Sequence, residues 1–159
     1  MAFRSPSFDA VQEVSVGNVV LGRAPVKIIS SVCAATAEEM IEQAKAIEAS
    51  GADIIEWRAD YFADDTSWQE AVAAMKAVVT KPVIYTFRSQ SEGGVRTEPM
   101  SSTTWRKKVL AAIDSKLFDA VDIEFDRGRA EFLVEAARKA GIVSIVSWHS
   151  FVPGEYDEE

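Results

Sequence analysis

The sequence predicts an α/β protein whose strands form a parallel β-sheet. Apolar strand-like runs alternate with amphipathic helical stretches between residues 27 and 149, at intervals of roughly 30 residues. Such alternation is typical of right-handed βαβ units, in which a helix links each strand to the next parallel strand. No linker-like or low-complexity tract divides the chain, and we therefore expect one domain over residues 1–159.

The N-terminal segment precedes these units and has a different pattern. Residues 1–10 show no regular hydrophobic period and are expected to be flexible. Short apolar runs follow over Val14–Val16 and Val19–Leu21, separated by a Gly-Asn pair that readily adopts the positive φ of a primed turn. The sequence therefore predicts a β-hairpin over residues 12–22.

The repeating units can be placed one by one. Thr36 and Glu39 form a capping box that marks the start of the first helix, and Gly51 marks its end. The strands are predicted over Lys27–Cys33, Asp53–Asp60, Val83–Arg88, Ala120–Phe125 and Ile142–His149. The helices are predicted over Thr36–Gly51, Ser67–Val79, Thr103–Lys116 and Arg129–Ala140.

Ionisable residues occupy one face of four of these strands. They are Glu56 and Arg58 on the second strand, Arg88 on the third, Asp122 and Glu124 on the fourth, and His149 on the fifth. A parallel strand covered on both faces is normally apolar, and α/β proteins bind ligands at the C-terminal ends of their strands. An open doubly wound sheet could bury such groups only at its switch point, whereas a barrel directs all of them toward one axis. We therefore favour a TIM (β/α)8 barrel, here an incomplete barrel of about five parallel strands, over an open sheet.

Composition and motif content argue against several kinds of partner. The 25 acidic and 17 basic residues give a formal net charge of -8, which disfavours nucleic acid. The single cysteine, Cys33, cannot form an internal disulfide, and no apolar run is long enough to cross a membrane. One histidine and one cysteine are too few ligands for a tight zinc site, and no glycine-rich phosphate-binding motif is present. We expect a cytoplasmic protein with no cofactor, no metal, no nucleic acid and no membrane contact.

The polar strand residues also have structural interpretations. Glu56 and Arg58 could form a structural ion pair, and Asp122 and Glu124 could form a solvated or capping pair. His149 is expected at a strand end, facing the same way as two arginines and a glutamate. That position favours a role in chemistry over a structural one.

With these residues in place, the sequence resembles type I 3-dehydroquinate dehydratase, a lyase of the shikimate pathway built on a TIM barrel. The resemblance covers the chain from about Val14 to Phe151. The matching segments are Lys27-Ile-Ile-Ser-Ser31, Ile55-Glu-Trp-Arg-Ala-Asp60, Thr86-Phe-Arg-Ser89 followed by Glu92-Gly-Gly94, Val121-Asp-Ile-Glu124 and Ser147-Trp-His-Ser-Phe151. The Glu-Trp-Arg and Thr-Phe-Arg segments, in this order and spacing, make the resemblance specific.

The resemblance implies dehydration of 3-dehydroquinate to 3-dehydroshikimate through an imine between a lysine and the substrate ketone. His149 matches the general acid and base of the family, and Glu92 matches the loop carboxylate that orients it. The matching substrate-binding residues are Ser31, Glu56, Arg58 and Arg88. Trp57, in the same Glu-Trp-Arg segment, is counted with them, although its position on the opposite strand face favours helix packing.

The sequence departs from the family in two respects. Trp148 and Ser150 flank the histidine, where the family usually has asparagine and aspartate. The imine-forming lysine of the family belongs at the end of a sixth strand, whereas all eight lysines of this sequence precede His149. We therefore expect the 159-residue chain to be inactive alone. The alternative is a non-catalytic carboxylate-binding or interaction protein derived from the family.

An incomplete barrel would leave its first and last strands unpaired and its interior open to water. Each large apolar side chain left uncovered forgoes about 1.5–3 kcal/mol of stabilisation. We therefore expect a homodimer, another form of self-association or a complementing segment to cover the gap.

Overall fold

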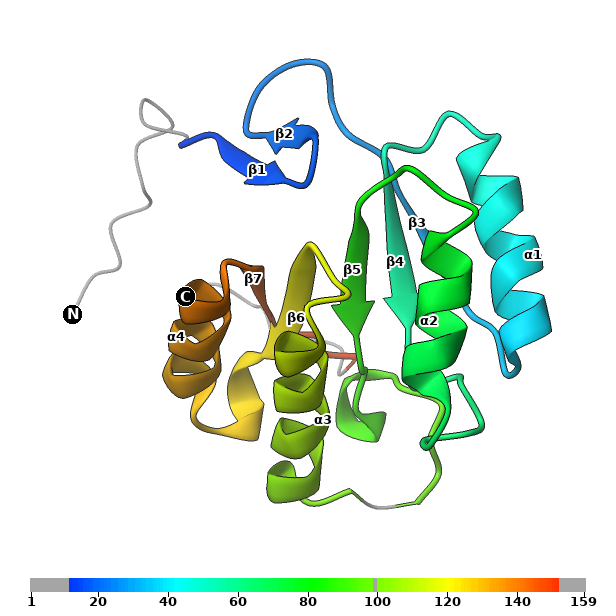
Figure 1. The fold of residues 1–159 in the computed structure, drawn as a ribbon. Helices are drawn as coiled ribbons and strands as arrows, with labels where there is room; N and C mark the ends of the chain where they lie inside the picture. The colour runs from blue at the N-terminus through cyan, green and yellow to red at the C-terminus, as the bar shows by residue number, and fades with distance from the viewer. Residues whose placement is uncertain (1–11, 99, 152–159) are drawn as a thin grey trace.

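The computed structural model describes residues 12–98 and 100–151, and Figure 1 shows their fold. The predicted flexible leader over residues 1–10 lies outside the described residues. The strands are β1 (Val14–Val16), β2 (Val19–Leu21), β3 (Ile29–Val32), β4 (Ile54–Arg58), β5 (Val83–Thr86), β6 (Ala120–Glu124) and β7 (Val143–Ser147). The α-helices are α1 (Ala37–Glu48), α2 (Trp68–Lys76), α3 (Ser102–Ser115) and α4 (Ala130–Ala140), and the 3₁₀ helices are η2 (Gln90–Glu92) and η3 (Phe125–Arg127). No helix in the described part of the chain is both long and apolar enough to span a membrane.

The main sheet has the strand order expected of a barrel. Its strands run β3-β4-β5-β6-β7, and every neighbouring pair is parallel. Because the spatial order follows the chain order, the sheet lacks the reversal of order that defines a doubly wound fold. Right-handed crossovers that all advance in one direction place the helices on one face. Figure 1 shows α1 to α4 in an arc outside the sheet, which confirms the predicted incomplete barrel with its five parallel strands.

The predicted hairpin is also confirmed, and it covers one end of the inner face. β1 and β2 pair antiparallel around Gly17, whose φ is 56°. A Cβ at Gly17 would come within 2.9 Å of Pro82, just before β5. Val16 is fully buried against Ile54, Ile84 and Ala120, near the N-terminal ends of the parallel strands. The hairpin therefore closes the N-terminal end of the sheet, and the predicted site lies at the other end.

Alternation along the strands separates two layers of side chains. Trp57, Tyr85 and Ile123 point outward into the main core beneath the helices. The residues that the helices contribute to this core include Met40, Val72, Val109 and Leu133. Each is buried, because the amphipathic stripe of its helix faces the sheet. The residues between the outward-facing ones are left on the inner face, where the predicted site residues lie.

All five parallel strands end before their predicted C-terminal residue, and three of them end two residues early. β4, β5 and β7 end at Arg58, Thr86 and Ser147, each two residues before its predicted end. Asp60 and Arg88 therefore lie on loops just past the sheet. The alternation of side chains does not show where a strand ends. Past the strand ends, Asp60 and His149 form hydrogen bonds with other loops in place of the hydrogen bonds between strands.

Candidate active site

Arg88 is the centre of a buried ion cluster on the inner face of the sheet. Its Nη1 lies 3.3 Å from Glu124 Oε1 and 3.5 Å from Glu92 Oε2, and its Nη2 lies 3.2 Å from Asp122 Oδ1. Nη1 also donates to Ser147 Oγ at 3.0 Å. The β5, β6 and β7 ends thus meet around one guanidinium that is only 7% exposed.

Hydrogen bonds and positive charges surround the buried carboxylates of this cluster and offset the cost of burying their charge. Glu124, which is fully buried, accepts from the Ser89 backbone N–H at 2.7 Å and lies 3.4 Å from Arg127 Nε. Asp122 accepts from the Ser147 hydroxyl at 2.8 Å. Burial raises the pKa of Asp122, and the positive charge of Arg88 opposes that rise. The structural interpretation of Asp122 and Glu124 as a solvated pair is wrong, because both side chains are buried around Arg88.

His149 joins the same cluster through Glu92. Its Nδ1 lies 2.9 Å from Glu92 Oε2, the oxygen that also faces Arg88. The His149 side chain is 41% exposed, whereas the Glu92 side chain is 6% exposed. In the tautomer that carries its proton on Nδ1, His149 donates a hydrogen bond to Glu92 Oε2, and Nε2 is the nitrogen that can accept a proton from a ligand. The geometry therefore presents an oriented imidazole, backed by a buried carboxylate, at the mouth of the inner face.

The loop that carries Glu92 depends on two glycines. Gly93 has a φ of 88°, a conformation that side chains strongly disfavour. Gly94 donates its backbone N–H to the Ser89 carbonyl at 2.8 Å, and a Cβ at Gly94 would lie 2.1 Å from the Arg88 carbonyl oxygen. Only glycine allows this loop to fold so tightly onto Arg88. The Glu-Gly-Gly sequence thus positions the carboxylate.

Glu56 links three strands farther along the same face. Its Oε2 accepts from Ser31 Oγ at 2.5 Å, and its Oε1 accepts from Thr86 Oγ1 at 2.8 Å. Ser31 and Glu56 are register partners in β3 and β4. The two hydroxyls orient a carboxylate that can accept hydrogen bonds from the hydroxyl groups of a polyol.

Arg58 is paired with Asp60, two residues along the chain. Arg58 Nε and Nη2 donate to the two oxygens of Asp60 at 2.8 and 2.9 Å, a bidentate pair. Asp60 also accepts from the backbone N–H groups of Arg88 and Val95, each at 3.3 Å. The hydrogen bonds that Arg58 donates to the Asp60 carboxylate raise the pKa of Arg58, so the guanidinium stays protonated. The structural alternative of an ion pair between Glu56 and Arg58 is wrong, because Arg58 pairs with Asp60 and Glu56 accepts from two hydroxyls.

Trp57 does not belong to this site. The resemblance predicts that Trp57 contacts substrate with Glu56 and Arg58, and this is wrong: Trp57 is only 1% exposed, on the opposite face of the sheet. There its ring stacks on Trp68 and Phe118, with centroids 6.0 and 5.8 Å away. Strand alternation, rather than the conspicuous Glu-Trp-Arg motif, locates this side chain.

Sequence reasoning missed two residues of the site. Asp60 shares the face of Arg58 by strand alternation, which was the available signal, but its contact with the Arg88 backbone depends on the loop after β5. Arg127 lies on η3 and lines a cavity of about 440 Å³ together with Glu92 and His149. No periodic signal marks a residue on so short a turn. No group of three or more histidine, cysteine or carboxylate side chains suited to a metal ion occurs among the described residues.

The protonation of Glu92 makes a testable contribution to stability. Burial raises the pKa of Glu92, which the hydrogen bond from His149 only partly offsets. A carboxyl whose folded pKa is raised stabilises the fold below its ordinary value of 4.5, and this contribution is lost as the pH rises through the raised pKa. The wild type should therefore lose stability relative to Glu92→Gln as the pH increases from about 4.5 to 7, measured by urea unfolding.

Glu135→Gln is the matched control. Two hydrogen bonds from Arg138 lower the pKa of this exposed carboxyl to about 2, so it is ionised throughout that range. Its replacement should not change the pH dependence between pH 5 and 7. Parallel pH curves for the wild type and Glu92→Gln would show that Glu92 is not held in the buried environment described here.

Comparisons with known proteins place this geometry in a family. The profile of the family described as type I 3-dehydroquinase matches residues 28–157. The 3-dehydroquinate dehydratase of Salmonella paratyphi B is 35% identical over 149 residues, which cover 89% of this chain and 58% of that protein. The chain thus spans less than two thirds of the length of this curated relative.

Solved structures agree with the sequence comparison. A type I 3-dehydroquinate dehydratase from Clostridium difficile, covalently modified with comenic acid, superposes with a TM-score of 0.81 at 26% identity, over 87% of this chain and 56% of that one. The enzyme from Enterococcus faecalis superposes with a TM-score of 0.76 at 30% identity, over 87% of this chain and 59% of that one. With its sequential parallel sheet and the Arg88–Glu92–His149 cluster at the strand ends, the chain belongs to the type I 3-dehydroquinase family.

Proposed function

We propose that this chain supplies the substrate-binding and proton-transfer groups for the dehydration of 3-dehydroquinate. The observation that carries the proposal is the convergence of Arg88, Glu92 and His149 at one end of the inner face. The reaction removes a proton next to the substrate ketone and expels a hydroxyl as water. It needs a cation for the carboxylate, acceptors for the hydroxyls and a group that can both take and return a proton.

The described residues divide these tasks among themselves. Arg88 and Arg58 provide guanidinium groups on the inner face for the substrate carboxylate. Ser31 and Glu56 provide polar atoms for its hydroxyls. His149, held through Nδ1 by Glu92, takes the proton next to the ketone and returns one to the departing hydroxyl.

The nucleophile that forms the imine is not among these residues. The lysines of the sequence are Lys27, Lys45, Lys76, Lys81, Lys107, Lys108, Lys116 and Lys139. Most lie on or at the ends of α1 to α4, and the other two, Lys27 and Lys81, precede β3 and β5 at the N-terminal end of the sheet. We propose that a lysine from outside this sequence completes the site, and that the 159 residues alone bind substrate without turning it over.

The open sheet supports the proposal that another polypeptide segment covers it. Ile29 on β3 is 47% exposed and Val146 on β7 is 51% exposed, at the two edges of the sheet. These edges would pair with a second copy of the chain or with a complementing segment. The lone cysteine needs no oxidising compartment, so the cytoplasm is the proposed location.

The first experiment measures binding by the 159-residue chain. Isothermal calorimetry with quinate, a non-reacting analogue, should show binding that is weakened in Arg88→Lys. Lysine keeps the charge of arginine but lacks its planar fork, so it cannot reproduce the directed contacts of the two terminal nitrogens of Arg88. Arg138→Lys, the same change at an exposed position on α4, is the control and should bind as the wild type does.

The second experiment tests the chemistry. The chain is joined to the C-terminal segment of the Salmonella paratyphi B relative, the part of that protein that lies beyond the matched residues. Borohydride should then trap an adduct with 3-dehydroquinate, detected by mass spectrometry. Quinate binding without any trapped adduct would favour the alternative function, a non-catalytic carboxylate-binding protein, for which the absence of lysine from the inner-face cluster is the supporting observation. If neither quinate binding nor a trapped adduct were observed, the enzymatic and the non-catalytic function would both be contradicted.

A further inference from the structure

A second hollow lies on the outer side of the sheet, away from the candidate active site. It has a volume of about 260 Å³ and lies between α2 and α3. Its floor consists of outward-facing residues of β4, β5 and the loops after them, among them Trp57, Tyr85 and Phe87. The proposed reaction uses none of these side chains.

The hollow exists because α2 and α3 do not pack closely. α1 packs against α2, and α3 packs against α4, but α2 and α3 approach each other much less. Thr104, Lys107, Lys108 and Ala111 line the hollow from α3. Their spacing places them on one stripe of the helix, beside the buried stripe that enters the core. Polar and small residues therefore occupy the position where a packed helix pair would have large apolar ones.

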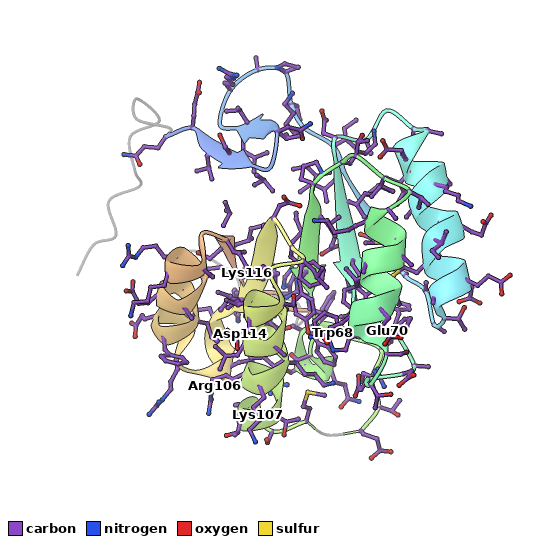
Figure 2. The ribbon with its side chains drawn as sticks, in the orientation of Figure 1. Trp68, Glu70, Arg106, Lys107, Asp114 and Lys116 are labelled. Carbon is purple, nitrogen blue, oxygen red and sulfur yellow. The ribbon has the colours of Figure 1, made fainter. Side chains whose placement is uncertain are left out.

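Aromatic rings form most of the walls. Trp68, at the start of α2, stacks on Trp57 with centroids 6.0 Å apart, and Tyr85 meets Trp57 edge-on at 5.7 Å. Phe87 closes one side, with the Lys108 ammonium 5.2 Å from its ring centroid. Figure 2 shows Trp68 in the space between α2 and α3, with Lys107 near the N-terminal end of α3. Flat aromatic walls favour a flat aromatic ligand, through offset or edge-on ring contacts.

Two hydrogen-bond donors of this hollow, on Tyr85 and Trp57, have no hydrogen-bond partner in the described part of the chain. The Tyr85 hydroxyl makes no hydrogen bond with any residue in the described part of the chain, although the side chain is buried. The indole N–H of Trp57 is buried and likewise unpartnered within the described residues. Buried hydrogen-bond donors are normally satisfied by protein, water or a ligand.

The cations at the rim differ from each other. Lys108 is held by Asp65, with Nζ 2.8 Å from Oδ2. Lys107 is exposed and has no ion-pair partner among the described residues. Burial and the nearby Asp65 raise the pKa of Tyr85, so its hydroxyl remains a donor at neutral pH. The rim of the hollow therefore offers one positive charge without an ion-pair partner, on Lys107, and the floor offers one donor without an acceptor, on Tyr85.

From this arrangement we infer that the hollow binds a small aromatic carboxylate, whose ring lies against Trp68 and Phe87 and whose carboxylate meets Lys107 and the Tyr85 hydroxyl. The size fits this class, because an engineered apolar cavity of about 150 Å³ holds benzene, and 260 Å³ leaves room for a substituent on a single ring. The expected dissociation constant is on the order of a millimolar, as for other ligands of about ten heavy atoms.

Nuclear magnetic resonance of the indole N–H groups tests this inference with benzoate as the probe. The chain has four tryptophans, and benzoate should shift the signals of Trp57 and Trp68 but not that of Trp148, which lines the separate cavity beside His149. At low ionic strength benzoate should bind about threefold more tightly than neutral benzamide, as expected for an exposed charge pair. This preference should disappear in Lys107→Ala and persist in the control Lys139→Ala on α4.

Two further variants define the site. Tyr85→Phe removes only the hydroxyl and should weaken benzoate binding about fivefold. Ala111→Phe fills the hollow from α3 and should abolish binding. Unchanged signals of Trp57 and Trp68, or benzoate binding that survives Ala111→Phe, would overturn the inference. Equal affinity for benzoate and benzamide in the wild type would overturn the carboxylate assignment. Because quinate binds on the other side of the sheet in our proposal, Arg88→Lys should leave benzoate binding unchanged.

Discussion

Replacement of Arg88 by methionine is expected to lower the free energy of unfolding of the chain by about 3–5 kcal/mol at pH 7. Methionine preserves much of the apolar stem but removes the guanidinium. Three buried carboxylates, on Glu92, Asp122 and Glu124, then lose the positive charge that they share. Uncompensated charges in a buried site are far more destabilising than the loss of a surface pair, so urea unfolding should show a large decrease.

The pH dependence of this loss distinguishes charge from packing. Burial already raises the pKa values of Glu92 and Asp122, and the loss of Arg88 would raise them further. Since protonation relieves the repulsion, the difference from the wild type should shrink as the pH falls toward 4.5. A deficit that stayed constant over this range would indicate lost packing, and no deficit at pH 7 would show that the cluster is not formed.

Arg138→Met is the matched control. Arg138 lies on α4 and forms two hydrogen bonds with Glu135, each 2.8 Å long, but both side chains are exposed. Exposed pairs contribute little because water and salt screen them, so this variant should differ from the wild type by less than about 1 kcal/mol.

Strand alternation predicted the sides of the sheet correctly. It placed Glu56 and Arg58 on the inner face and Trp57 on the outer face, and the structure confirms both assignments. This success has a physical reason, because a period of two is a property of the local backbone. The motif resemblance added Trp57 to the binding residues, against the alternation, and the structure places it in the core.

The pairing of the charges could not be predicted in the same way. The cluster around Arg88 joins loops and strands that are up to 59 residues apart in the chain. Its geometry depends on the tight turn at Gly94, where a Cβ would collide with the Arg88 carbonyl. The true partner of Arg58 was on the predicted face, as Asp60, but the choice between Asp60 and Glu56 depends on the hydroxyls of Ser31 and Thr86. Sequence periodicity gives the face of a residue, whereas tertiary contacts decide its partner.

Replacement of His149 by alanine is expected to decrease kcat by about 10²–10⁴-fold in the protein completed with the Salmonella paratyphi B segment. The imidazole is oriented by a single carboxylate, Glu92, and its remaining nitrogen is available for proton transfer. Since the side chain is 41% exposed, its removal leaves no buried cavity, and urea unfolding should change by less than about 1 kcal/mol. A role in proton transfer predicts a large effect on kcat, a smaller one on KM, and partial rescue by added imidazole.

A comparison with Ser147→Ala separates proton transfer by His149 from a role in positioning the substrate. Ser147→Ala is the control on the same strand, because its hydroxyl bridges Arg88 and Asp122 and does not touch the imidazole. It should affect substrate binding more than kcat, and added imidazole should not rescue it. If His149→Ala retained a kcat within about tenfold of that of its parent, His149 would not be the group that transfers the proton, although Glu92 orients it. The proton-transfer step would then have to be assigned to another group at the strand ends, and the adjacent cavity lined by Arg127 would be the place to look.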